Sequence, residues 1–281
     1  MKFRRKPLTL VLLCTLLASC GGPRAERRVS PDTARRELFL RGHSYKEEVF
    51  LDRAHDGDVV AVKLFLYAGM SPEVRNKDGE TPLLLASRYG HAKAARALLD
   101  NGADPNARDG KGITPLMRAT MGGSPEVVST LLEFKPDPNA HAADGSTALM
   151  YAVWKGRPEV VDLLLQAGAD VNASDTVVGT ALTWAAYYDR EEFIEKLLAR
   201  GADPNVANNV GGTPLMIAAT KGNARILRML LEAGADPSAK DRGGKTALDW
   251  AKETRRPEAA RLLQDAPAAP RKSPKEADGG R

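Results

Sequence analysis

Apolar and polar positions follow a pattern that repeats along most of the chain. A threonine followed two residues later by leucine recurs every 33 residues, at Thr81, Thr114, Thr147, Thr180, Thr213 and Thr246. Each threonine opens a short apolar run such as 83–86, and a second run with helical spacing follows, clearest at 160–165. Each unit is therefore predicted to form two antiparallel helices. Units this small bury their apolar faces only by stacking, so the chain is predicted to be an all-α solenoid.

The residues at the ends of these runs predict where the helices begin and end. A threonine side chain can accept a hydrogen bond from a free amide of the first helical turn, and the proline that follows it in several repeats loses no hydrogen bond there. The second helix of most units is followed by Gly-Ala-Asp, as at 102–104. Glycine adopts the left-handed conformation that a helix C-terminus needs, so these glycines mark the helix ends.

Three segments carry a resemblance to a known family. They are Thr-Pro-Leu-Met-x-Ala-Ala-x-x-Gly at 213–222, Val-Val-x-Leu-Leu-Leu at 160–165 and Gly-Ala-Asp-Pro-Asn at 102–106. Together they resemble the ankyrin repeat. The resemblance implies an ankyrin-repeat solenoid of about seven helix-turn-helix repeats with β-turn tips, over residues 48–265. The first repeat lacks the Thr-x-Leu signature, as terminal repeats often do.

The second of the six Thr-x-Leu repeats, which begins at Thr114, ends in a departure from this pattern. Lys135-Pro136-Asp137 stands where the other repeats have Gly-Ala-Asp. Either a residue with a side chain takes the position where glycine is preferred or a different turn forms, and a local cost of about 1 kcal/mol is expected.

The N-terminal residues resemble a bacterial lipoprotein signal. A basic start at 2–6 precedes an apolar run at 8–17 that is too short to cross a membrane, and Leu-Ala-Ser-Cys at 17–20 resembles a lipobox. We expect residues 1–19 to be a signal peptide and Cys20 to be the lipidated first residue of the mature protein. An ordinary signal peptide with an incidental cysteine, or an uncleaved anchor, is the alternative. Gly21 stands where aspartate would resemble an inner-membrane retention signal, so we expect the outer membrane, facing the periplasm.

Composition divides the remaining residues into further segments. Residues 20–36 contain glycine, proline and arginine and are expected to be a flexible tether, and 37–47 an N-terminal cap. Ser44 and Glu47 have the spacing of a capping box for the first helix of the repeats. Residues 266–281 contain no aromatic residue and are expected to be a disordered tail.

The small net charge expected for the mature protein argues against a nucleic-acid partner. The whole chain has a formal net charge of +5, and removal of the four basic residues of 1–19 lowers it to +1. Binding to nucleic acid usually needs a concentrated cationic surface.

In ankyrin folds, the turn tips and the exposed end of the first helix line a concave face. The two residues before the glycine that ends the first helix are expected to point into it, and aromatic and cationic residues gather at those positions. The predicted partner-binding residues are Arg88, Tyr89, Met121, Trp154, Lys155, Tyr187, Tyr188 and Lys221. Trp184 and Trp250 occupy the repeat position of Leu85 and are expected in the core.

No motif for catalysis, phosphate binding or metal binding stands in the sequence, and no cofactor is expected. We expect a monomeric, non-catalytic module that is tethered to the bacterial envelope by lipid and binds a periplasmic protein. An immunity protein that neutralises a secreted toxin enzyme is the alternative, and an enzyme is the rival from another class. The identity of the partner is not encoded in a recognisable motif.

Overall fold

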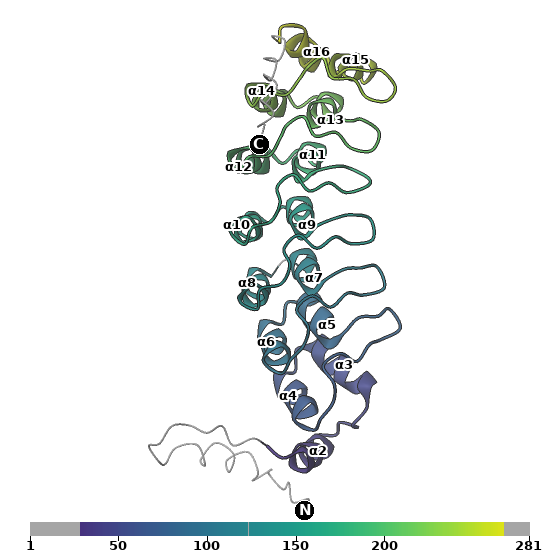
Figure 1. Ribbon diagram of the computed structural model, residues 1–281, viewed down its shortest axis with the longest axis vertical. Helices are drawn as coiled ribbons and strands as arrows, with labels where there is room; N and C mark the ends of the chain where they lie inside the picture. The colour runs from purple at the N-terminus through teal and green to yellow at the C-terminus, as the bar shows by residue number, and fades with distance from the viewer. Residues whose placement is uncertain (1–28, 123, 267–281) are drawn as a thin grey trace, which may run out of the picture.

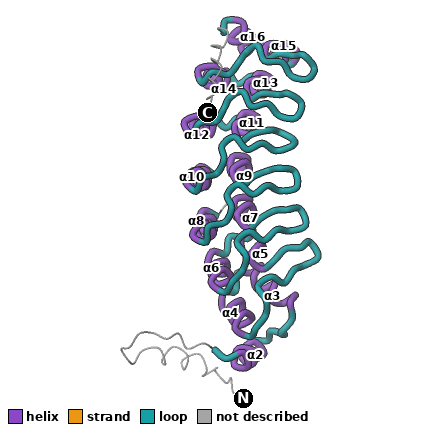
Figure 2. The backbone as a smooth tube through the Cα atoms, in the orientation of Figure 1, coloured by secondary structure: helices purple, strands orange, loops and turns teal. Residues whose placement is uncertain are grey.

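The computed structural model describes residues 29–122 and 124–266. Within them the chain is a single stack of helical hairpins whose turn tips all project to the same side (Figure 1). Only helices and loops are drawn in the described part of the chain (Figure 2), apart from one isolated bridge between Ser174 and Thr180. The predicted all-α solenoid is confirmed. The predicted signal peptide, Cys20 and most of the tail lie outside the described residues.

Seven hairpins follow one N-terminal helix, α2 (Pro31–Leu40), in the described residues. The hairpins are α3 (Glu47–Asp56) with α4 (Val59–Tyr67), α5 (Pro82–Arg88) with α6 (Ala92–Asp100), α7 (Pro115–Gly122) with α8 (Pro125–Glu133), α9 (Ala148–Lys155) with α10 (Pro158–Gln166), α11 (Ala181–Tyr187) with α12 (Glu191–Ala199), α13 (Pro214–Lys221) with α14 (Ala224–Glu232), and α15 (Ala247–Glu253) with α16 (Pro257–Gln264). We call α3, α5, α7, α9, α11, α13 and α15 the first helices and their partners the second helices.

The apolar core runs through the whole stack. Each first helix packs on the next one, and most neighbouring second helices do the same. Side chains such as Leu83, Leu116 and Leu149, which share one repeat position, are almost fully buried. Because each repeat is covered by its neighbours, the stack has one continuous core rather than seven separate ones.

The threonines begin the first helices as predicted. The Thr81 side chain accepts a hydrogen bond from the backbone N–H of Leu84, and the equivalent bond is present at Thr114, Thr147, Thr180, Thr213 and Thr246. Lys135 has φ of 51°, so of the two alternatives for this site the structure has a left-handed residue with a side chain.

Two details at the N-terminal end differ from the sequence predictions. Helix α2 begins at Pro31, inside the range expected for the tether, because the Ser30 side chain caps it and the proline occupies its first turn. Helix α3 begins at Glu47 after Lys46, which makes no side-chain cap. The predicted capping box from Ser44 is therefore wrong, since Ser44 lies too far before the first helical turn.

Candidate protein-binding face

The turn tips and the exposed side of the first helices form one face of the stack, which we call the inner face. At its N-terminal end lies an open hollow of about 760 Å³. Helix α3 lines one side of it, the tip at 75–80 lines another, and the end of α5 completes it. Of the eight predicted binding residues, Arg88 and Tyr89 line this hollow.

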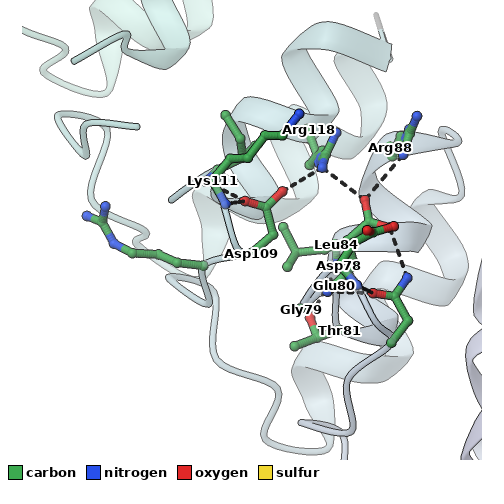
Figure 3. A network of polar contacts seen from close by, with 12 residues as sticks. Asp78, Gly79, Glu80, Thr81, Leu84, Arg88, Asp109, Lys111 and Arg118 are labelled. Atoms are coloured by element: carbon green, nitrogen blue, oxygen red, sulfur yellow. Dashed lines mark hydrogen bonds and ion pairs between the residues drawn. The ribbon is translucent and has the colours of Figure 1, made fainter. Parts of the chain in front are cut away.

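A network of buried charges fixes two neighbouring tips on this face (Figure 3). The Glu80 carboxylate lies 3.2 Å from the guanidinium of Arg88 and 2.9 Å from that of Arg118. Arg118 also donates to Asp109 Oδ2 at 2.5 Å. Asp109 Oδ1 accepts from the backbone N–H groups of Lys111 and Ile113. Because Arg118 bridges carboxylates of two repeats, it holds the two tips in a fixed relation.

The same arrangement returns wherever a tip begins with aspartate. Asp175 Oδ2 accepts from the indole N–H of Trp184 at 2.6 Å, and Asp241 Oδ2 accepts from that of Trp250 at 2.8 Å. In each case the donor lies nine residues after the aspartate, as Arg118 does after Asp109. Where the tip begins with asparagine, at 76 and 208, the residue nine positions on is Leu or Ile. At these three tips the second carboxylate oxygen therefore accepts from a donor on the first helix, and the spacing of nine residues is visible in the sequence.

Aromatic rings form a continuous run across the middle of the inner face. The ring centroids of Trp154 and Trp184 are 6.4 Å apart, those of Trp184 and Tyr188 5.8 Å, and those of Tyr187 and Tyr188 5.0 Å. Tyr151 adds a further contact with Trp154 at 6.3 Å. Burial of the Tyr151 side chain raises the pKa of its hydroxyl above the ordinary value. The run links α9 to α11 and joins core rings to surface rings.

Cations lie over the surface rings at both ends of this run. Lys155 Nζ is 4.0 Å from the centroid of Trp154, and Lys221 Nζ is 4.5 Å from that of Tyr187. Two repeats earlier, the Arg88 guanidinium lies 5.4 Å from the ring centroid of Tyr89. Cation–π attraction therefore holds these cationic groups in position over the rings.

Six of the eight predicted binding residues are exposed, and the other two are half-buried. Tyr89, Tyr187 and Tyr188 are 44%, 43% and 36% exposed. Met121 and Trp154 are half-buried and pack against the core. Trp154 is partly covered because the ring of Trp184, in the next repeat, lies against it.

The two tryptophans expected in the core also differ from one another. Trp184 is 9% exposed, as predicted. Trp250 is half-buried, because in the described residues no further first helix packs on α15 to cover it. Sequence reasoning missed Glu80, Asp109 and Arg118; the signal was a charged residue, Arg118, at the repeat position of buried Leu85.

Family models describing ankyrin repeats match residues 66–119, 101–175, 155–198 and 180–272. The model of three ankyrin copies alone spans more than half of the chain. The chain belongs to the ankyrin repeat family. Ankyrin repeat domains bind protein partners and are generally non-catalytic, so this chain is a protein-interaction module.

Solved ankyrin repeat structures share the fold of this chain. The ankyrin repeat domain of Bcl-3, described as a unique member of the IkappaB family, has a TM-score of 0.68 and 30% identity, and covers 76% of this chain and 97% of its own. The human ASB11 ankyrin repeat domain has a TM-score of 0.68 and 29% identity, with coverage of 78% and 99%. None of the curated proteins compared with the chain matches it.

The described residues contain no group of three or more His, Cys, Asp or Glu side chains placed to hold a metal ion. Among the helices of residues 29–122 and 124–266, none has the length and apolar character needed to cross a membrane.

Proposed function

We propose that this ankyrin repeat protein is a non-catalytic interaction module held at the bacterial envelope by lipid on Cys20, and that its inner face binds another envelope protein. The observation that carries the proposal is the aromatic run on α9 and α11, which ends in exposed Tyr187 and Tyr188. Tyrosine and tryptophan beside cations are the side chains that most often anchor protein interfaces.

The lipid anchor rests on the N-terminal sequence. Leu-Ala-Ser-Cys at 17–20 follows an apolar run of signal-peptide length, and the stack of repeats begins only after residue 30. Each buried methylene of an acyl chain adds about 0.8 kcal/mol of membrane affinity, so several chains give stable attachment. Cys20 on the outer membrane would present the repeats to the periplasm.

Removing the exposed tyrosines tests the binding face. The variant Tyr187→Ala/Tyr188→Ala is expected to lose capture of envelope proteins by the full-length protein in its native envelope, measured by crosslinking and mass spectrometry. Tyr67→Ala is the matched control, because Tyr67 is 38% exposed on α4, a second helix outside the inner face. Equal capture by the folded double variant and the parent protein would remove the binding face from the proposal.

The anchor has its own matched pair of variants, because Cys14 and Cys20 are the two cysteines of the chain. Cys20→Ser is expected to abolish labelling with fatty acid and release the protein from membranes, whereas Cys14→Ser retains both. Fatty-acid labelling of Cys20→Ser contradicts the anchor.

The stoichiometry of capture separates two roles. A tight one-to-one complex with a single secreted enzyme favours an immunity protein. Several partners of lower affinity favour a scaffold that concentrates envelope proteins at the membrane.

A further inference from the structure

Several cations on the inner face have no carboxylate partner in the described part of the chain. Lys155 and Lys221 contact only aromatic rings. The remaining ones, at the tips, make no ion pair among these residues: Lys77, Lys111, Lys240 and Arg242. Their charge is therefore available to a partner.

Cations on the second helices, in contrast, form ion pairs with acidic residues of neighbouring repeats. Arg96 on α6 lies 2.6 Å from Glu133 on α8, Lys196 on α12 lies 2.6 Å from Asp162 on α10, and further pairs link α12 to α14 and α14 to α16. These pairs join neighbouring repeats and neutralise the cations locally. The contrast shows that the unpaired cations of the inner face do not follow simply from a shortage of acidic residues.

The carboxylates of the inner face are mostly buried. Glu80, Asp109 and Asp175 are 3%, 8% and 3% exposed, and each contacts the side chain of Arg118 or Trp184. Asp109 and Asp175 also accept hydrogen bonds from backbone N–H groups. The tips expose only the carboxylates of Asp78 and Asp144. Asp189, at the end of α11, is also exposed. From the second to the sixth repeat, the exposed cations Lys77, Lys111, Lys155 and Lys221 outnumber these three carboxylates.

The first repeat has the opposite sign. Glu47, Glu48 and Asp52 on α3 are exposed, line the hollow and make no ion pair among the described residues. The inner face is thus acidic at α3 and basic along the tips and helix ends that follow.

We propose that the inner face takes an extended acidic segment of a protein, with its carboxylates on Lys111, Lys155 and Lys221 and its apolar side chains against Tyr187 and Tyr188. The proposal rests on the proposed function and names the chemistry of its partner. Repulsion by the acidic α3 places the acidic segment over the second to sixth repeats.

The geometry of the rings favours carboxylates over nucleic acid. Single-stranded nucleic acid binds by stacking its bases on open aromatic faces. Here ammonium groups lie over one face of Trp154 and of Tyr187, and each of these rings also contacts a neighbouring ring. An ammonium held on a ring keeps N–H donors that can point outward to a carboxylate.

Binding of simple probes to the full chain tests the proposal. The probes are a fluorescent peptide of alternating Glu and Tyr, a Lys and Tyr peptide of equal length, and a thymidine oligonucleotide, compared by fluorescence anisotropy at low salt. The Glu–Tyr peptide is expected to bind most tightly. Lys155→Glu/Lys221→Glu is expected to weaken it about tenfold or more, and added salt is expected to weaken it in the parent.

The matched control is Lys63→Glu/Lys93→Glu, on α4 and α6, which makes the same change in net charge at exposed lysines without ion pairs among the described residues. Its affinity is expected to stay within about twofold of the parent. Equal weakening by both variants, tighter binding of the Lys–Tyr peptide or the oligonucleotide, or no binding of the Glu–Tyr peptide at about 1 mM overturns the proposal.

This result is distinguishable from failure of the proposed function. Suppose that Tyr187→Ala/Tyr188→Ala loses envelope capture while Lys155→Glu/Lys221→Glu captures the same proteins as the parent. The proposed interaction module is then retained, and the proposed acidic partner segment is contradicted.

Discussion

Arg118 shows how one residue ties two repeats together. It occupies the repeat position of buried Leu85, yet its guanidinium contacts Glu80 of the preceding repeat and Asp109 of its own. Both carboxylates are almost fully buried. Removing a cation that faces buried carboxylates leaves them without compensation, which is far more costly than removing an exposed pair.

Arg118→Met is therefore expected to lower the free energy of unfolding by about 3 kcal/mol, measured by urea denaturation. Arg88→Met is the control, because the Arg88 side chain is 45% exposed and Glu80 keeps Arg118 and Asn76 as donors. Its cost is expected to stay below about 1 kcal/mol. Equal costs for the two variants would contradict the bridging role of Arg118.

Lys135 gives a prediction with the opposite sign. Its φ of 51° lies in the left-handed region, where the equivalent Gly102 has φ of 86°. Lys135→Gly is expected to raise the free energy of unfolding by about 1 kcal/mol, and the reciprocal Gly102→Lys to lower it by a similar amount. A destabilised Lys135→Gly protein in thermal or urea unfolding would show that this lysine makes a compensating contact.

Residue positions were predictable from the sequence to different degrees. The threonine caps and the left-handed position of Lys135 depend on local backbone geometry, which the repeat fixes. The burial of Trp154 depends on the side chain in the next repeat, Trp184, and on which way both rings turn. The repeat position of a residue alone therefore does not predict this burial.

At the scale of elements, the ends of the stack were the least predictable. Helix α2 extends further toward the N-terminus than its composition indicated, and α3 begins without the predicted cap. The helix boundaries of the interior repeats recur every 33 residues, so a wrong boundary in one repeat is corrected by comparison with its neighbours. The terminal helices have no second copy to compare.

Two aspartates of the last repeat, Asp241 in the tip and Asp249 in α15, predict how its stability depends on pH. Hydrogen bonding from the backbone N–H of Lys245, with further bonds from Trp250 and Gly243, lowers the pKa of Asp241 below its ordinary value of 3.8. Likewise, the backbone N–H of Thr246 lowers the pKa of Asp249 below 3.8. A carboxyl whose pKa is lower in the folded state contributes stability above its unfolded pKa, and loses that contribution as pH falls through the folded pKa.

The last repeat is therefore expected to loosen as pH falls below 3.8, seen as movement of the Trp250 indole NMR signal toward its unfolded position. Asp241→Asn is expected to reduce this pH dependence, because an uncharged acceptor remains, as Asn208 provides in the preceding repeat. An unchanged acid transition in Asp241→Asn would show that Asp241 does not control it.

At the scale of the whole molecule, the period determined the architecture. Contacts between neighbouring repeats suffice to define the stack, so seven hairpins were predictable without any long-range information. The charge pattern was not, because the net charge conceals how cations are distributed. Lys155 and Lys221 lie on aromatic rings of the inner face, whereas the cations of the second helices are in ion pairs. This difference becomes visible only when the helices are placed in space.

The central claim is that the inner face, and not the outer helices, contacts the partner. Its most direct test places a photo-reactive amino acid at position 188 in one protein and at position 67 in another, since Tyr188 and Tyr67 are 36% and 38% exposed on opposite sides of the hairpins. Irradiation in the native envelope is predicted to crosslink a defined protein from position 188 and none from position 67. Crosslinks of equal yield from both positions, or from position 67 alone, would contradict the account.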